Sequence, residues 1–227
     1  MSNPCHHLPN PRLYTLVRGF ARFAVWLLTR TTIHGLENLP LRGPYIIVTN
    51  HLSAIDPPLV LASIPTCITV FAADTHRYEF IVGELMNALG AIWVRRGEVD
   101  RESLRSALHV LKAGGVIGMA PEGTRSRTGG LLEGKIGAAY LANRADVPLI
   151  PVALAGTEVG LPSVFRLARP RLTVTIGKPF CLPDANPRTD RQQLQAHTEL
   201  IMRMLAAMLP EKLRGVYRDS VRPMADS

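Results

Sequence analysis

Short apolar, β-branched runs alternate with segments of helical periodicity along most of this 227-residue chain. The run Tyr-Ile-Ile-Val-Thr at residues 45–49 is typical of a buried strand. This alternation favours a single α/β domain, with a mostly parallel mixed sheet that is flanked by helices. In such a sheet, functional side chains gather in loops at the carboxyl ends of the strands. Further strands are predicted at residues 68–72, 91–94, 116–119, 149–154 and 172–176, and helices at residues 58–63, 78–89, 101–113, 136–144 and 189–209.

The first thirty residues contain four arginines and no acidic residue, so they carry half of the formal net charge of +8. Within them, residues 12–29 have apolar positions three and four residues apart, with most of the arginines off the apolar stripe. Such a basic amphipathic helix is typical of a membrane interface, whereas most amphipathic helices pack on a core. Both interpretations stay open at this point.

The predicted organisation has no membrane-spanning segment. The longest uncharged apolar stretch, residues 57–73, is interrupted by Pro65 and is shorter than the roughly 20 residues that a transmembrane helix needs. We therefore expect a basic amphipathic membrane-interface helix at residues 1–32, the main domain at residues 33–209 and a polar tail at residues 210–227.

A histidine and an aspartate follow the strand predicted at residues 45–49. His51 and Asp56 are five residues apart, which on an α-helix would turn their side chains about 140° away from each other. They can meet in a loop, and Pro57 favours one because it disfavours helical backbone at Asp56. Such a pair could take a proton from a hydroxyl nucleophile, with the carboxylate fixing the tautomer of the imidazole. The alternative is an ordinary loop histidine beside an aspartate that caps a helix.

The segment Pro-Glu-Gly-Thr-Arg-Ser at residues 121–126 follows another predicted strand. Arg125 can bind a phosphate through two hydrogen bonds, and backbone amides around Gly123 can assist it. Glu122 could hold a ligand hydroxyl or orient Arg125. A polar surface turn is the alternative interpretation.

The strand predicted at residues 91–94 ends in Arg95 and Arg96. Alternation sends their side chains to opposite faces, so one could line a site while the other is solvated. A solvated pair is the simpler interpretation.

Four blocks occur in order: N-H-x4-D-P from Asn50, G-x-I-x-x-x-R from Gly90, P-E-G-T-R-S from Pro121 and V-P-x-x-P-V from Val147. Together they resemble the lysophosphatidate (1-acylglycerol-3-phosphate) O-acyltransferase family over about residues 33–180. The resemblance implies transfer of an acyl group from acyl-CoA or acyl carrier protein to the free hydroxyl of 1-acylglycerol-3-phosphate, which forms phosphatidate. Since the chain has no Gly-x-Ser-x-Gly elbow, direct attack by the acceptor is favoured over an acyl-enzyme.

The resemblance also implies roles for individual residues. The thioester would be a co-substrate, and no metal or organic cofactor is implied. His51 would be the general base with Asp56 as its orienting partner, Arg96 and Arg125 would bind the acceptor phosphate, and Glu122, Gly123 and Thr124 would line the acceptor site.

Two departures from the family pattern keep other functions open. Ala120 stands where the family often has phenylalanine, and Arg77 is the only cation where it often has lysine. The alternatives are acylation of a different lysolipid and a non-catalytic lipid-binding protein on the same fold. Nucleic-acid binding is disfavoured, because the sequence has no helix-turn-helix, zinc or aromatic RNA-binding pattern.

The expected partners are an anionic membrane surface, a lysophospholipid acceptor and a thioester donor. The three cysteines have no metal-like spacing, and their odd number favours a reducing compartment. We accordingly expect peripheral association with the cytoplasmic face of a membrane.

Overall fold

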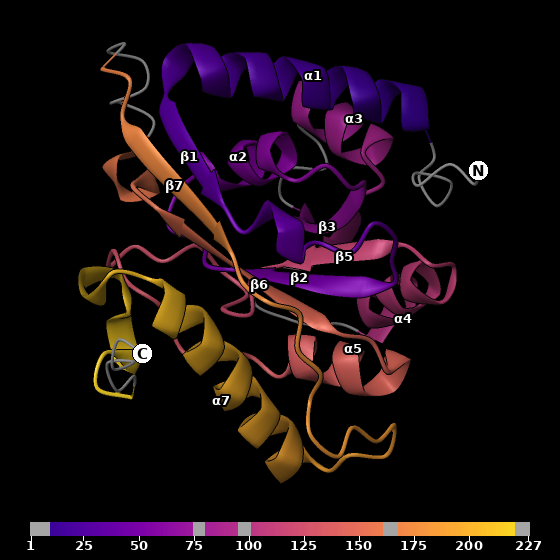
Figure 1. Ribbon diagram of the computed structural model, residues 1–227. Helices are drawn as coiled ribbons and strands as arrows, with labels where there is room; N and C mark the ends of the chain where they lie inside the picture. The colour runs from indigo at the N-terminus through magenta and orange to yellow at the C-terminus, as the bar shows by residue number, and fades with distance from the viewer. Residues whose placement is uncertain (1–9, 75–79, 95–100, 161–167, 221–227) are drawn as a thin grey trace.

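The computed structural model describes residues 10–74, 80–94, 101–160 and 168–220. These residues contain a seven-stranded sheet between two layers of helices (Figure 1). All neighbouring strands are parallel except β6 and β7, which are antiparallel. This confirms the predicted mostly parallel α/β sheet. The strands are β1 (Arg30–His34), β2 (Tyr45–Thr49), β3 (Ile68–Ala73), β4 (Ile92–Val94), β5 (Val116–Met119), β6 (Leu149–Ala155) and β7 (Arg171–Ile176), in the order β1-β7-β6-β2-β5-β3-β4.

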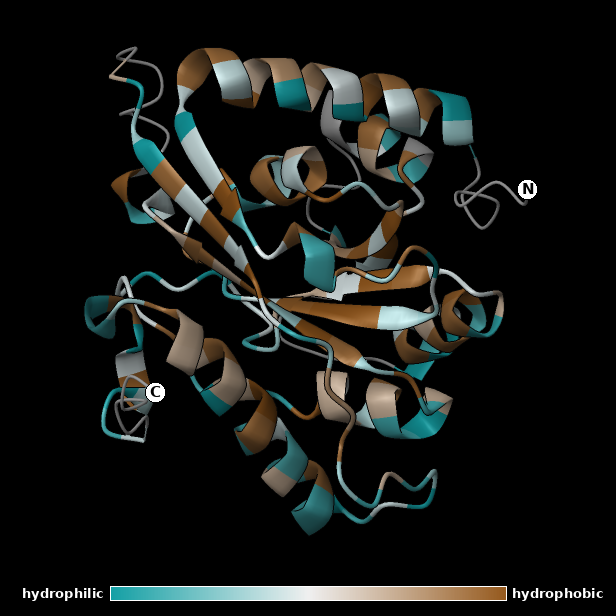
Figure 2. Ribbon diagram, in the orientation of Figure 1, coloured by the Kyte–Doolittle hydropathy of each residue, from teal (hydrophilic) through white to brown (hydrophobic). Residues whose placement is uncertain are grey.

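The helices form two layers because the central strands are apolar on both faces. In β2, Tyr45 and Ile47 face one core, and Ile46 and Val48 face the other. Helices α1 (Pro11–Leu28), α2 (Asp56–Ser63) and α3 (Phe80–Ala88) lie on the first side, and α4 (Arg101–Lys112), α5 (Gly137–Ala145) and α7 (Arg191–Met208) lie on the second (Figure 1). In Figure 2 the hydrophobic central strands lie between the two layers.

Strand β1 was not predicted from the sequence. It has Ile33 as its single apolar residue, its alternate residues are exposed, and it lies at the edge of the sheet beside β7. An exposed edge strand lacks the apolar run that identifies a buried strand. The expected boundary between residues 32 and 33 therefore falls inside β1.

Helix α1 has two apolar faces with different environments. On the inner face Tyr14 and Ala21 are buried, and the Tyr14 hydroxyl accepts a hydrogen bond from Ile68 N at 2.9 Å. Arg18 donates to Pro65 O at 2.7 Å, so this arginine ties α1 to the domain. The outer face leaves five large apolar side chains exposed, namely Leu16, Phe20, Phe23, Trp26 and Leu27. No helix among the described residues is long and apolar enough to cross a membrane.

The described residues 210–220 of the expected polar tail are mostly exposed, but two of them are part of the core. Short 3-10 turns at Glu211–Leu213 and Gly215–Tyr217 bury Leu213 and Tyr217. Both side chains pack with Leu205 and Leu209, near the end of α7, and with Leu131. The few apolar residues in this segment are separated by polar ones, which concealed the packing in the sequence. Other 3-10 turns are at Leu36–Asn38 and Thr157–Val159.

The two described cysteines, Cys67 and Cys181, are in different states. Cys67 is buried and disulfide-bonded, whereas Cys181 is free and exposed. Cys67 thus differs from the reduced cysteines that were expected, and the cytoplasmic face stays a prediction.

Candidate functional site

The loop between β2 and α2 brings His51 and Asp56 into direct contact. His51 Nδ1 lies 2.8 Å from Asp56 Oδ2. The same carboxylate oxygen accepts hydrogen bonds from the backbone N–H groups of Leu52 and Ser53, each at 2.7 Å. Asp56 is 2% exposed, so three donors surround an otherwise buried charge.

Asp56 is the first residue of α2, which corrects the prediction that Pro57 keeps it outside the helix. A proline is accepted at the first turn of a helix because the N–H that it lacks has no partner there. The expected separation of the two side chains is still avoided, because His51 lies in the non-helical segment before α2. The predicted meeting of His51 and Asp56 is therefore present, with the aspartate on the helix and the histidine in the loop.

The His51–Asp56 contact fixes the chemistry of the imidazole. An ionised carboxylate can only accept hydrogen bonds, so Nδ1 carries the proton and Nε2 keeps its lone pair. The His51 side chain is 27% exposed, which leaves it accessible to a ligand. This arrangement can take a proton at Nε2, and Asp56 would then stabilise the resulting imidazolium.

Asn50 anchors the start of this loop, and the sequence did not single it out as a site residue. Its side chain is fully buried. Its amide nitrogen donates to Leu154 O at 2.9 Å, and its carbonyl oxygen accepts from Leu154 N at 2.8 Å. Since Leu154 is in β6, these two bonds fix the end of β2 to its neighbour on one side.

Glu122 fixes the loop on the other side, from the end of β5. Strands β2 and β5 are parallel neighbours, with Val48 opposite Met119, so the segments that follow them meet at one edge of the sheet. Glu122 is 1% exposed, and its two oxygens accept from His51 N and Leu132 N, each at 2.9 Å. Ser126 N in turn donates to His51 O at 2.7 Å.

The two hydrogen bonds to the His51 backbone place the whole 122–126 segment beside the histidine. Burial raises the pKa of Glu122, while the backbone donors at Leu132 and His51 lower it to a smaller extent. Because both oxygens already hold backbone groups, the geometry favours a positioning role for Glu122 over binding a ligand hydroxyl or orienting Arg125.

The remaining residues of this segment face solvent. Gly123, Thr124 and Arg125 are exposed, and Gly123 has a φ of +65°, a conformation that favours glycine. The Arg125 guanidinium makes no hydrogen bond or ion pair with the described residues, so it is available to an anionic ligand. Arg96, the other predicted phosphate-binding residue, lies outside the described residues together with Arg95 and Arg77.

Comparison with known proteins agrees with this geometry. Residues 30–155, more than half of the chain, match the family model described as Acyltransferase. The chain belongs to the acyltransferase family. The match contains the His51 loop and the 122–126 segment, and it excludes α1 and α7.

The chain is similar to proteins named 1-acyl-sn-glycerol-3-phosphate acyltransferase. It is 26% identical over 148 residues to the 1-acyl-sn-glycerol-3-phosphate acyltransferase of Borreliella burgdorferi, which covers 64% of this chain and 59% of that protein. It is 31% identical over 154 residues to the chloroplastic enzyme BAT2 of Brassica napus, covering 65% of this chain and 44% of that protein. The chain thus spans about half the length of these relatives.

A solved structure shares the fold. The 1-acyl-sn-glycerophosphate (LPA) acyltransferase PlsC from Thermotoga maritima superposes with a TM-score of 0.64 at 25% identity. The alignment covers 83% of this acyltransferase and 76% of that chain. The likeness therefore extends beyond residues 30–155.

Proposed function

We propose that this chain transfers a fatty acyl group from a thioester to the free hydroxyl of 1-acylglycerol-3-phosphate, which gives phosphatidate. The observation that carries the proposal is the His51–Asp56 pair, held beside the exposed Arg125 by two hydrogen bonds to the His51 backbone. The proposed base and the exposed Arg125 therefore belong to two loops that are joined by hydrogen bonds. The names of the similar proteins support the acceptor.

The reaction follows from the open Nε2 atom of His51. As the acceptor hydroxyl attacks the thioester carbonyl carbon, its proton passes to Nε2, and Asp56 stabilises the imidazolium. The tetrahedral intermediate collapses by breaking the C–S bond, and the thiolate leaving group takes the proton back from His51. The new ester bond forms in one acyl transfer, so no acyl-enzyme is needed.

The exposed Arg125 supports a phosphorylated acceptor. Arg125 can hold two phosphate oxygens through parallel N–H donors, and its loop is tied to His51 by the Ser126 N–H. We propose that Arg96 shares this phosphate, and that Glu122, Gly123 and Thr124 shape the site around it. The thioester, from acyl-CoA or acyl carrier protein, is a co-substrate, and the proposed mechanism uses no metal or organic cofactor.

The outer face of α1 provides a way to reach a lipid acceptor. Its five exposed apolar side chains lie on a helix that is docked to the domain by Tyr14 and Arg18. Aromatic side chains with flanking arginines suit the interface of an anionic membrane. We propose peripheral attachment through this face. The cytoplasmic side stays a prediction.

Product identification tests the proposed reaction. The purified protein, incubated with lysophosphatidate and either acyl-CoA or acyl carrier protein thioester, should yield phosphatidate by mass spectrometry. A panel of lysolipids with and without phosphate tests the acceptor. Preference for a phosphate-free acceptor would refute the roles of Arg125 and Arg96, and vesicle binding without turnover would indicate a lipid-binding protein.

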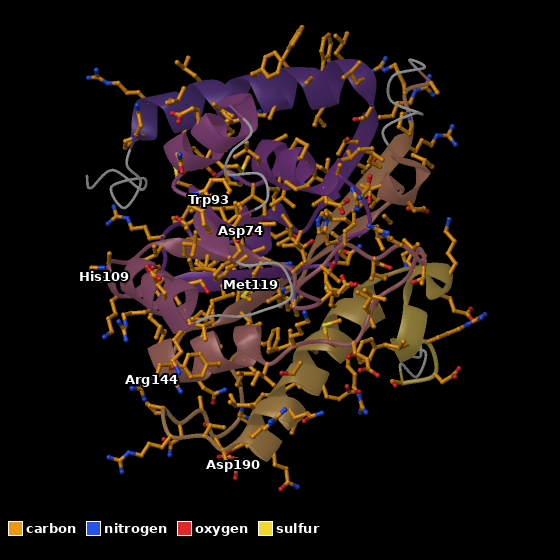
Figure 3. The ribbon with its side chains drawn as sticks, turned by 180° about the vertical axis from the view of Figure 1, so that it is seen from behind. Asp74, Trp93, His109, Met119, Arg144 and Asp190 are labelled. Atoms are coloured by element: carbon orange, nitrogen blue, oxygen red, sulfur yellow. The ribbon has the colours of Figure 1, made fainter. Side chains whose placement is uncertain are left out.

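Substitution of His51 tests the mechanism. His51→Ala should lower kcat by about 10²- to 10⁴-fold, which is the usual cost of losing a general base. The matched control is His109→Ala, because His109 is an exposed histidine on the outer side of α4 (Figure 3). The control should retain full activity. A folded His51→Ala protein with the wild-type rate would rule out the proposed base.

A further inference from the structure

Lys135 lies across the exposed turn of the acceptor segment, although nothing in its sequence context marked it as a site residue. A Cβ atom placed on Gly123 would be 2.9 Å from Lys135 Cδ and 3.2 Å from Lys135 Nζ. The lysine side chain therefore occupies the space that a larger residue at position 123 would fill. Lys135 is exposed and makes no ion pair with the described residues.

The backbone that carries Lys135 is attached to the same turn. Lys135 N donates to Pro121 O at 2.8 Å, and three residues earlier Leu132 N donates to Glu122 Oε2. Glu122 Oε1 holds the His51 N–H. The 132–135 segment and the His51 loop are thus connected through a single buried carboxylate.

Residues 213–217, after α7, form hydrogen bonds with the backbone of residues 131–134, just before Lys135. Leu131 N donates to Leu213 O at 3.0 Å, and Val216 N donates to Leu131 O at 3.2 Å. Gly134 N, next to Lys135, donates to the Tyr217 hydroxyl at 3.1 Å. Burial raises the pKa of Tyr217, so its hydroxyl stays neutral near pH 7.

We infer that Lys135 is a further cation for the acceptor phosphate, in addition to Arg125 and Arg96, and that Tyr217 is a positioning residue that places Lys135 over the Glu122–Gly123 turn. The inference rests on the proposed function, and it names residues of that same site. Cations from an exposed turn and from the segment packed on it can share the charge of one phosphate. Tyr217 would act through the Gly134 backbone, without touching the substrate.

Substitution of Lys135 tests its direct role. Lys135→Met should raise the KM for lysophosphatidate about tenfold or more, the cost of losing a charge-assisted hydrogen bond. The kcat and the KM for the donor should stay within about twofold, because neither depends on this cation. Lys135→Arg should restore most of the affinity, and Lys112→Met, at an exposed lysine on α4, should leave all constants unchanged.

Substitution of Tyr217 tests positioning. Tyr217→Phe keeps the buried ring and removes the acceptor for Gly134 N, so the KM for lysophosphatidate should rise about two- to tenfold. Combined with Lys135→Met, it should produce no further rise, because Tyr217 acts through Lys135. Tyr140→Phe is the control, since the Tyr140 hydroxyl makes no hydrogen bond with the described residues. A purely structural Tyr217 would lower the melting temperature and leave every KM unchanged.

The outcomes separate this inference from the proposed function. If the wild type makes phosphatidate and Lys135→Met keeps the wild-type KM, the role of Lys135 is refuted alone. If the double variant shows the full sum of both effects, the positioning role of Tyr217 is refuted. If the wild type forms no phosphatidate, the proposed function fails and the inference fails with it.

Discussion

Two buried carboxylates, those of Asp56 and Glu122, contact different parts of His51. Asp56 directs one oxygen at three donors, including the imidazole, whereas Glu122 directs one oxygen at each of two backbone amides. Asp56 therefore controls the side chain of the histidine, and Glu122 controls its backbone. Neither carboxylate is paired with a lysine or arginine among the described residues. Hydrogen bonds satisfy both oxygens of Glu122 and Oδ2 of Asp56, whereas the buried Oδ1 of Asp56 has no partner among them.

The raised pKa of Glu122 predicts a defined dependence of stability on pH. The folded protein holds this proton more tightly than the unfolded chain, where the pKa is near 4.5. Stability must then fall as the pH rises above 4.5 through the raised pKa, and level off above it. Since a glutamine does not titrate, the free energy of unfolding of the wild type minus that of Glu122→Gln should fall over this range.

Urea denaturation of the two proteins between pH 4 and 8 measures this difference. Contributions of groups distant from Glu122 are common to both proteins and cancel in the subtraction. A difference that rises with pH would mean that the His51 and Leu132 amides outweigh the burial of Glu122, which contradicts the expected direction.

At the scale of elements, the sequence predicted those segments whose apolar pattern is internal to them. The strands β2 and β5 have the predicted bounds, and the predicted helices are present within about two residues at each end. Strand β1 and the turns at residues 211–217 were missed, because their stability comes from partners distant in the sequence. A periodicity argument cannot detect a contact between Leu131 and Leu213.

The site, like the helices and strands, was predictable from the sequence only where it did not depend on partners distant in the sequence. The topology rule placed His51 and Glu122 at the carboxyl ends of strands, and the register of β2 with β5 adds that these two strands are neighbours. The buried position of Glu122 and the anchoring by Asn50 depend on backbone groups of other segments. A sequence pattern does not indicate with which backbone group a side chain will form a hydrogen bond. Lys135 could have been noticed only as a lone cation in a glycine-rich stretch.

The contact between α5 and α7 depends on one buried asparagine. Asn143 donates to Ala139 O at 2.7 Å and to His197 Nδ1 at 2.9 Å. Its carbonyl oxygen accepts from Asn186 N and from the Thr189 hydroxyl, each at 3.3 Å. Because removal of the amide leaves the buried His197 Nδ1 without this partner and ends the contacts with Asn186 and Thr189, Asn143→Ala should lower the free energy of unfolding by about 2–4 kcal/mol.

Thr198→Val provides the control for this prediction. It removes a buried hydroxyl whose bond to Leu194 O lies within α7, and it should cost less than about 1 kcal/mol. Equilibrium unfolding in urea compares the two variants. Equal losses would mean that the Asn143 network adds nothing to the docking of α7.

At the scale of the whole molecule, strands β1 to β6 and the loops of His51 and Glu122 lie within the family match, whereas α1 and β7 lie outside it. Figure 2 shows α1 along one side of the molecule, with hydrophobic residues along its length. The helix is both a packed part of the domain, through Tyr14 and Ala21, and an exposed apolar surface. Deleting it would therefore disturb the fold together with the surface, and point substitutions on the outer face give a cleaner test.

The double variant Phe20→Gln, Trp26→Gln removes two aromatic side chains that are 73% and 68% exposed. Full burial of such a side chain is worth about 1.5–3 kcal/mol, so partitioning onto anionic vesicles should weaken by about 10²-fold. Vesicle sedimentation measures the bound fraction, and unchanged unfolding confirms that α1 remains docked. The control is Leu36→Gln, Leu41→Gln, which removes two exposed leucines between β1 and β2. If both double variants bind as the wild type does, the outer face of α1 is not the membrane surface; if both lose binding equally, attachment depends on general hydrophobicity and not on this helix.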